Sequence, residues 1–193
     1  MSSKYGTPWL WIAGAGALGW LLYSQRSTVA RVYASGVEDV TAAVTGWKEV
    51  NTGPAWVPFI NSVETQYGIP PDLLARVAYQ ESRFRPDVIS GDTPGGAGEL
   101  GIMQMMPQYF TSVNVPRPYT VGDVEAQIRE AAGLLSRLMD RFNDWGLAVA
   151  AYNDGASNVD KYLANTRALP DSTIEYVSAV LADVPLSGAT IPG

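Results

Sequence analysis

The spacing of apolar and polar residues changes along the chain and divides it into segments. Residues 5–25 carry no charge and are rich in Trp, Leu, Ile, Ala and Gly, and about 20 such residues are enough for a helix to cross a bilayer. Residues 27–49 place Val, Tyr and Trp at helical spacing between polar residues, which is typical of an amphipathic helix. We therefore predict a hydrophobic helix over residues 1–26 and a helical stalk with its linker over residues 27–54.

The hydrophobic start has two other interpretations, a cleaved signal peptide and a buried helix of a soluble protein. Lys4 ahead of a short apolar core suits a signal peptide, but no small-x-small cleavage site follows Tyr23, so we favour a retained transmembrane helix. Lys4 on one side and Arg26 with Arg31 on the other leave the orientation nearly undecided, with a slight preference for the basic side after the span.

From residue 55 onward the pattern is helical with short breaks, and no alternating strand of any length is present. The Asn-Thr-Gly-Pro cluster at residues 51–54 marks a domain boundary, and the Gly- and Ser-containing residues 185–193 predict a flexible tail. The fold class is therefore mainly α, with a helical domain over residues 55–184. We expect its helices near residues 56–67, 71–82, 101–113, 123–142, 145–152, 156–165 and 171–182.

Composition narrows the possible chemistry. The chain contains neither Cys nor His, which excludes disulfides, thiol nucleophiles, Ser-His triads and the usual zinc ligand sets. Catalysis would have to use carboxylates, hydroxyls and amides, and we predict no metal and no cofactor. The net charge is −6 and no run of basic residues is present, so nucleic acid is not expected as a partner.

One carboxylate occupies an unusual position, because Glu81 falls on the apolar face of the helix predicted over residues 71–82. Three apolar residues share that face at helical spacing: Leu74, Val77 and Ala78. Burial and the negative end of the helix would both raise the pKa of Glu81, as a general acid requires. The alternative is an ion pair between Glu81 and Arg83 or Arg85 at the helix end.

The segments around this acid change the balance between those interpretations. The chain contains YQESRFRPDVIS, then GELGIMQMMP, then LAVAAYNDGASNV, and finally LPDSTIEYV. In order and type, these four motifs resemble the lytic transglycosylases related to goose-type lysozyme, the soluble lytic transglycosylase (SLT) domain family. The resemblance spans residues 56–181 and implies a lysozyme-like α-helical fold that acts on peptidoglycan.

The resemblance also implies roles for individual residues. Glu81 matches the catalytic acid and base of the family, and five further positions match groove residues that bind substrate: Ser90, Gln104, Tyr152, Asn153 and Tyr176. Neutral donors, acceptors and aromatic faces are what N-acetylated sugars need. Each of these side chains also has a structural interpretation, as a bridge between helices, a core aromatic or a helix terminus, but together with Glu81 they favour a substrate groove.

The mechanism implied by the resemblance uses one carboxylate. N-acetylmuramic acid (MurNAc) attacks its own anomeric carbon through its 6-hydroxyl, and a 1,6-anhydro product results. The chain departs from the family in two places. Residues 91–97 lengthen the link after Ser90, and Glu99 stands where the family commonly has a small residue. A second carboxylate near the site would permit lysozyme-like hydrolysis instead.

We therefore expect a lytic transglycosylase that opens the wall locally during phage entry or during assembly of a secretion machine. Its expected partners are the glycan strands of peptidoglycan, the membrane through the N-terminal helix, and proteins of a virion or secretion complex. It would be membrane-anchored and face the periplasm, or be carried by a virion. The alternatives are a hydrolytic muramidase, a non-catalytic glycan-binding or structural module, and a pore-forming role for the first 50 residues.

Overall fold

The computed structural model describes residues 46–182 and 184–186 of the 193-residue chain. Within that part the fold is mainly α, and its only β contact is a single bridge between Leu100 and Met105. The predicted hydrophobic helix, most of the stalk and the end of the tail lie outside the described residues. The elements follow in the order η2 (Trp47–Glu49), α2 (Gly53–Tyr67), α3 (Leu73–Ser82), α4 (Pro86–Ile89), α5 (Val121–Phe142), α6 (Trp145–Asp154), α7 (Ala156–Leu163) and α8 (Asp171–Leu181).

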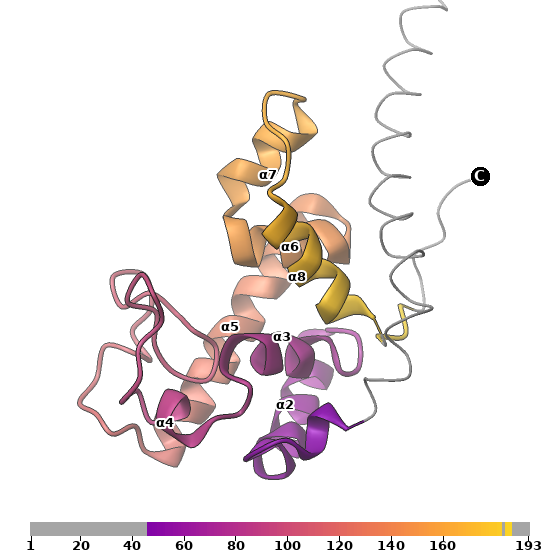
Figure 1. The fold of residues 1–193 in the computed structure, drawn as a ribbon. Coiled ribbons are helices and arrows are strands. Elements are labelled where there is room, and N and C mark those ends of the chain that lie inside the picture. The colour runs from indigo at the N-terminus through magenta and orange to yellow at the C-terminus, as the bar shows by residue number, and fades with distance from the viewer. Residues whose placement is uncertain (1–45, 183, 187–193) are drawn as a thin grey trace, which may run out of the picture.

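Among the described elements, helix α5 is the longest, and it connects the two ends of the domain (Figure 1). Its start is fixed by a capping box, in which the Thr120 hydroxyl accepts from the N–H of Asp123 and the Asp123 carboxylate accepts from the N–H of Thr120. One face of α5 then buries an apolar stripe at helical spacing: Val124, Ile128, Ala131, Leu135 and Leu138. This stripe packs α5 against α2 and α6.

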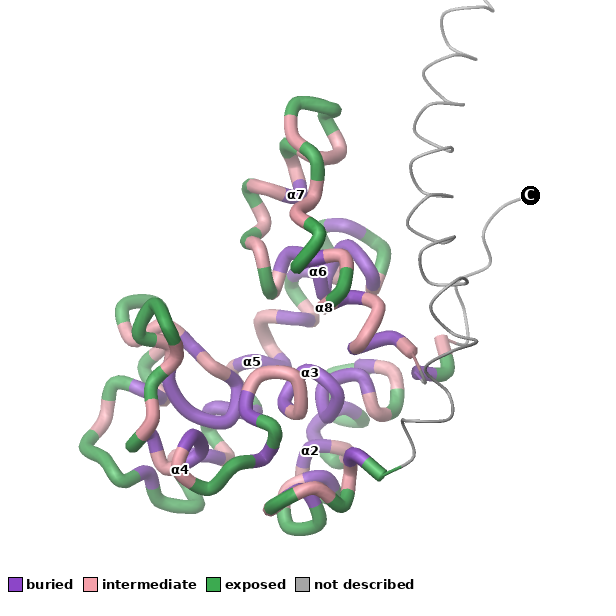
Figure 2. The backbone as a smooth tube through the Cα atoms, in the orientation of Figure 1, coloured by how far each residue is buried: buried purple, intermediate pink, exposed green. Residues whose placement is uncertain are grey.

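Helix α3 is central to the domain, since it packs against α2 on one side and α8 on the other. Figure 2 shows buried backbone concentrated in α3, α5 and α6, whereas exposed residues gather in the loops around α4 and beyond α7. Leu73, Leu74, Ala75, Val77 and Ala78 of α3 are fully buried. A helix so enclosed can hold a side chain at its end with little freedom.

The expectation of a helix over residues 101–113 was wrong, because these residues form turns. Leu100 and Met105 exchange two backbone hydrogen bonds of 2.9 Å across a tight turn. Gly101 (φ +76°) and Gln104 (φ +44°) have left-handed conformations, which a right-handed helix excludes. The apolar spacing that suggested a helix comes from side chains that this turn sends into the core, namely Ile102, Met103 and Met105.

Within residues 46–182 and 184–186, no helix has both the length and the apolar character needed to cross a membrane. The uncharged residues 5–25 lie outside that range.

Candidate active site

Glu81 lies on the last turn of α3 and is partly buried. The phenol of Tyr176 donates a 2.5 Å hydrogen bond to Glu81 Oε1. Tyr176 belongs to α8, 95 residues further along the chain, so the packing of α3 against α8 creates this pair. The carboxylate therefore sits in a fixed place with a hydrogen-bond donor directed at one of its oxygens.

The environment raises the pKa of Glu81 from 4.5 to about 7. Burial is the main cause, because the charged form loses water, and the negative charge of Glu99 adds to the rise. The hydrogen bond from Tyr176 and the positive charge of Arg83 lower the pKa, but they do not compensate for burial. A carboxyl group with this pKa is present in both protonation states near neutral pH, as an acid that later acts as a base requires.

Two phenols surround this carboxyl group and remain protonated. Burial raises the pKa of Tyr152 and of Tyr176 well above 10, and the negative charge of Glu81 raises both further. The Tyr152 hydroxyl donates to the main-chain oxygen of Met103 at 2.9 Å, which ties α6 to the turn before Gln104. Both phenols can thus serve as hydrogen-bond donors but not as bases.

Gln104 and Glu99 lie together beneath the lengthened loop. Gln104 Nε2 donates to the main-chain oxygen of Gly101 at 2.9 Å. A Cβ on Gly95 would be 2.5 Å from both Gln104 Oε1 and Glu99 Oε2, so the ends of these two side chains lie directly against the loop backbone at Gly95. Glu99 Oε2 also accepts from the N–H of Ala97 at 3.0 Å. The loop therefore holds the Glu99 carboxylate and the Gln104 amide side by side.

Asn153 is held from α8. The Thr173 hydroxyl donates to Asn153 Oδ1 at 3.0 Å, and Thr173 is only 2% exposed. Thr173 lies one turn before Tyr176 on the same helix. Helix α8 therefore places two side chains of the candidate site, Tyr176 by direct contact with Glu81 and Asn153 through Thr173. Thr173 was not predicted, although its spacing from Tyr176 was a usable signal.

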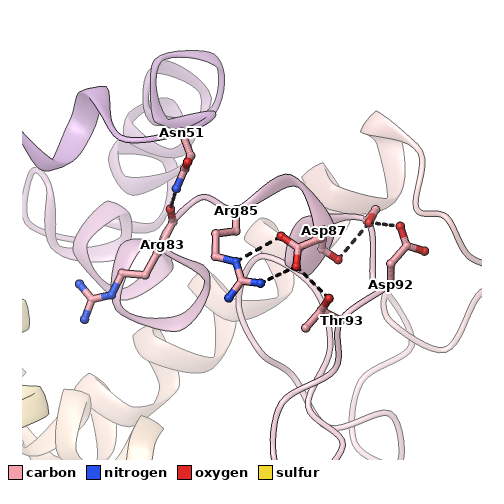
Figure 3. Close-up of polar contacts among 7 residues, drawn as sticks. Asn51, Arg83, Arg85, Asp87, Asp92 and Thr93 are labelled. Atoms are coloured by element: carbon pink, nitrogen blue, oxygen red, sulfur yellow. Dashed lines mark hydrogen bonds and ion pairs between the residues drawn. The ribbon is translucent and has the colours of Figure 1, made fainter.

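The side-chain hydrogen bonds of Ser90 stay within its own loop, and its main-chain oxygen accepts from the N–H of Tyr119 at 3.0 Å. Its hydroxyl lies 2.7 Å from Asp92 Oδ2 and 3.1 Å from the main-chain oxygen of Asp87, and it can donate to either. Arg85 and Thr93 both bind the Asp87 carboxylate, and Arg85 lowers the pKa of Asp87 (Figure 3). These contacts order the loop, and they leave Ser90 as the one predicted residue without a described link to the Glu81 cluster. In the described part of the chain, no three acidic side chains gather as metal ligands would.

Comparison with known proteins identifies the family. Residues 58–174, more than half of the chain, match the family model described as the transglycosylase SLT domain. The chain belongs to this family. Four of the five predicted groove residues and Glu81 lie within the matched range of the SLT domain, and Tyr176 lies two residues beyond it.

Individual relatives carry names that agree with the SLT assignment. The chain is 30% identical over 128 residues to the transglycosylase of Enterobacteria phage PRD1, covering 66% of this chain and 45% of that protein. It is 33% identical over 117 residues to the membrane-bound lytic murein transglycosylase D of Escherichia coli (strain K12), covering 53% and 25%. The chain thus spans less than half the length of either relative.

A solved structure also resembles this SLT domain. It is an inactive mutant of the lytic transglycosylase Slt from Pseudomonas aeruginosa, which matches with a TM-score of 0.51 and 27% sequence identity. The match covers 65% of this chain and 22% of that chain. The helical arrangement described here is therefore the lysozyme-like fold of the SLT family.

The SLT domain contains a second buried carboxylate that the sequence reasoning missed. Glu64 of α2 is 2% exposed, and it accepts from the N–H groups of Asp72 (2.8 Å) and Ala75 (3.0 Å) at the start of α3. Burial raises its pKa to about 7, although the backbone N–H groups of Ala75 and Asp72 lower it. Its spacing from Val57 and Ile60 places it on the apolar face of α2, and that position was a signal of burial.

A buried amide supports the turn that carries Gln104. Gln127 of α5 is fully buried, and its Oε1 accepts from the N–H of Ile102 at 3.3 Å. A Cβ on Gly101 would lie only 2.1 Å from Gln127 Oε1, so any other residue there would displace the turn. Gln127 also was not predicted, because its role depends on a contact between residues 25 positions apart.

Proposed function

We propose that this SLT domain is a peptidoglycan lytic transglycosylase. It cleaves the β-1,4 bond between MurNAc and N-acetylglucosamine and leaves a 1,6-anhydroMurNAc end. The observation that carries the proposal is Glu81, a carboxyl group of pKa about 7 held against the Tyr176 phenol. The names of the relatives support the choice of substrate.

The reaction needs two proton transfers through one group. Protonated Glu81 gives its proton to the glycosidic oxygen as the bond to the anomeric carbon breaks. The 6-hydroxyl of the same MurNAc then bonds to that carbon, and the Glu81 carboxylate takes the hydroxyl proton. Glu81 ends protonated again, so that the cycle closes with no added water and no second acid.

The neighbouring residues have roles that follow from their contacts. The Tyr176 phenol stabilises the Glu81 carboxylate after the first transfer, because a hydrogen bond to the charged form favours it. Tyr152, Gln104 and Asn153 would offer neutral donors and acceptors to the acetamido and hydroxyl groups of the sugars. Ser90 would contact the sugar from the adjacent loop.

Hydrolysis by a lysozyme-like muramidase is the second candidate. The observation that favours it is Glu99, whose negative charge reaches Glu81 and could activate a water molecule on the opposite side of the sugar. Against it, Glu99 Oε2 already accepts from the N–H of Ala97 and lies against the backbone of Gly95. We favour the transglycosylase because the carboxylate of Glu99 serves the loop.

Digestion of purified peptidoglycan separates these functions. Full-length wild type, Glu81→Gln and the control Glu175→Gln are incubated with sacculi, and the released muropeptides are analysed by mass spectrometry. Glu175 is an exposed acid next to Tyr176 in sequence, so its variant controls for loss of a charge on α8. Anhydro ends that disappear only in Glu81→Gln support the proposal. Reducing ends indicate hydrolysis, and no product from wild type indicates a binding module.

The proposal for location concerns residues outside the described range. Residues 1–26 would anchor the protein in a membrane, residues 27–54 would form the stalk and its linker, and the enzyme over residues 55–184 would face the periplasm or travel in a virion. The uncharged stretch 5–25 and the names of the two relatives support this division. Leu18→Arg should shift the full chain from carbonate-washed membranes to the soluble fraction, because a charge at mid-span costs about 3 kcal/mol. An unchanged distribution would contradict the anchor.

A further inference from the structure

The segment Trp47 to Thr52 is the last part of the predicted stalk and linker, directly before α2, and it packs on the helix that carries Glu81. Trp47 is only 4% exposed. Its ring centroid lies 5.7 Å from that of Tyr79 and 6.4 Å from that of Phe84. Tyr79 and Phe84 lie two residues before and three residues after Glu81, so the segment touches the chain on both sides of the acid.

The turn after Glu81 has a backbone conformation that needs support. Arg83 and Phe84 are consecutive residues with φ of +51°, a region that residues other than glycine adopt only when the surroundings enforce it. Phe84 is fully buried, and its N–H donates to the Ser82 hydroxyl at 3.2 Å. The main-chain oxygens of Arg83 and Phe84 both accept hydrogen bonds from the 47–52 segment.

Three hydrogen bonds make that connection. Asn51 Nδ2 donates to the main-chain oxygen of Arg83 at 2.8 Å, which Figure 3 shows. The Thr52 hydroxyl donates to the main-chain oxygen of Phe84 at 2.7 Å, and the Thr52 N–H donates to the same oxygen at 3.2 Å. The Arg83 oxygen is at the C-cap of α3, where the helix itself leaves carbonyls unpaired, and the Phe84 oxygen follows it.

The same segment also reaches the other end of α3. Lys48 Nζ lies 2.6 Å from the Asp72 carboxylate, directly before the first residue of the helix. The close fit depends on Gly53, since a Cβ there would be 2.3 Å from the Lys48 oxygen and 2.9 Å from the Phe84 ring. The 47–52 segment is thus attached at both ends of the helix that carries Glu81.

We propose that Asn51 and Thr52 are positioning residues for Glu81. They hold Arg83 and Phe84 in their left-handed conformation. These two residues fix the C-terminal end of α3, where Glu81 contacts Tyr176. Without them the turn relaxes to commoner backbone angles and the carboxyl group leaves its enclosed place. This inference rests on the proposed function, since positioning matters only if Glu81 reacts.

The test uses the full-length chain with two substitutions in the 47–52 segment, made singly and together as a double variant. Thr52→Val removes the hydroxyl, and Asn51→Gly removes the amide while tolerating the φ of +50° at that position. Thr52→Ser restores the hydroxyl. Thr65→Val is the matched control, because the exposed Thr65 hydroxyl also donates to a main-chain oxygen, that of Asn61, but far along α2 from the turn.

Three measurements are made on each variant: kcat and KM on peptidoglycan, the folded fraction by circular dichroism, and the pKa of Glu81. The last is read by NMR with 13C-labelled Glu carboxyl groups, assigned from the signal lost in Glu81→Gln. We expect the double variant to lose kcat by about 10-fold, as small displacements of a reacting group do, with KM nearly unchanged. The pKa of Glu81 should fall from about 7 toward 4.5, since its main cause is burial.

The outcomes separate this inference from the proposed function. Positioning is supported if Thr52→Ser keeps the wild-type kcat and Glu81 pKa that Thr52→Val loses, and if Thr65→Val changes neither quantity. A double variant whose kcat and Glu81 titration match those of Thr65→Val overturns it, as does a loss of activity that only follows the unfolded fraction. If wild type releases no muropeptides while the Glu81 titration still moves in the double variant, the proposed function fails and the structural coupling stands.

Discussion

Two carboxyl groups with the same raised pKa and different surroundings lie at opposite ends of α3: Glu64 of α2 contacts its start, and Glu81 belongs to its last turn. Glu64 at the N-terminal end and Glu81 at the C-terminal end both reach a pKa of about 7, and burial is the main cause in both cases. Glu64 is 2% exposed, and both of its oxygens accept backbone N–H groups. Glu81 is partly exposed, and its described hydrogen bond uses Oε1 alone.

The comparison shows that a perturbed pKa does not by itself identify a catalytic group. Burial raises the pKa of both groups, but both oxygens of Glu64 accept hydrogen bonds from the start of a helix, whereas the described hydrogen bond of Glu81 leaves Oε2 available. The number of unused acceptors and the access to solvent distinguish the two groups. Substitutions of Glu64 and Glu81 can test this distinction.

The largest expected effect is on activity. Glu81→Gln should lower kcat by about 1,000-fold or more, because it removes the acid and the base together. Glu64→Gln should keep most of the activity of each folded molecule, because Glu64 touches backbone groups only. Muropeptide release, normalised to the folded fraction by circular dichroism, measures both. Equal losses in the two variants would contradict the distinction.

Stability should show the opposite order. Glu64→Ala leaves the buried N–H of Ala75 and the part-buried N–H of Asp72 without their acceptor and opens a cavity, at a cost of about 2–4 kcal/mol in the free energy of unfolding. Glu81→Ala should cost clearly less, because no backbone group depends on that carboxylate for a hydrogen bond. Urea denaturation of both variants gives the two values. A Glu81→Ala that is the less stable variant would be evidence against this assignment.

The pH dependence of stability should reveal Glu64. Its folded pKa of about 7 lies above its ordinary value of 4.5, so its protonated form favours the folded state. The stabilisation is complete below pH 4.5 and is lost as the pH rises through 7, a change of about 3 kcal/mol. Unfolding free energies measured from pH 4.5 to pH 8 should fall less steeply in Glu64→Gln. An unchanged slope in that variant would exclude a titrating Glu64.

Removing the Tyr176 hydroxyl should move the activity profile to higher pH. The phenol lowers the pKa of Glu81, so Tyr176→Phe raises that pKa above about 7. Because the acid must be protonated to start the reaction, the alkaline limb of kcat/KM should move upward by up to about one pH unit. A limb that moves downward would mean that Tyr176 does not act on Glu81 as described.

Glu99→Gln should shift the pH profile of activity least, and in the opposite direction to Tyr176→Phe. The negative charge of Glu99 raises the pKa of Glu81, so its removal lowers that pKa and moves the alkaline limb downward by less than about one unit. The product should remain the 1,6-anhydro end. If Glu99→Gln instead abolishes the release of reducing ends by an active wild type, Glu99 is the second carboxylate of a hydrolase.

The sequence predicted the helical class well because long periodic segments depend on local pattern. Helices α5 and α8 begin and end within two residues of their expected bounds. The expected helix over 101–113 failed because a buried turn can place apolar residues at similar spacing, and the four-residue α4 is too short to leave a pattern. The hydrophobic N-terminal helix stays a prediction.

The candidate site was predictable only in part. Glu81 could be proposed from one helix face, but its contact with Tyr176 joins residues 95 positions apart. Glu64, Gln127 and Thr173 are polar residues that tertiary contacts bury, and their types alone do not indicate this. The binding roles of Ser90, Gln104, Tyr152 and Asn153 stay predictions until substrate contacts are measured.

The burial of Trp47 has a consequence for the design of a shorter fragment of this SLT domain. A fragment cut to the family match, residues 58–174, would lose the Trp47 ring from the aromatic cluster beside α3 and the phenol from Glu81. Such a fragment would keep all of α3 but would lack Trp47 and Tyr176, which pack against residues of that helix. A fragment that keeps these contacts has to begin before Trp47 and end after Leu181. It is therefore longer at both ends than the range matched by the family model.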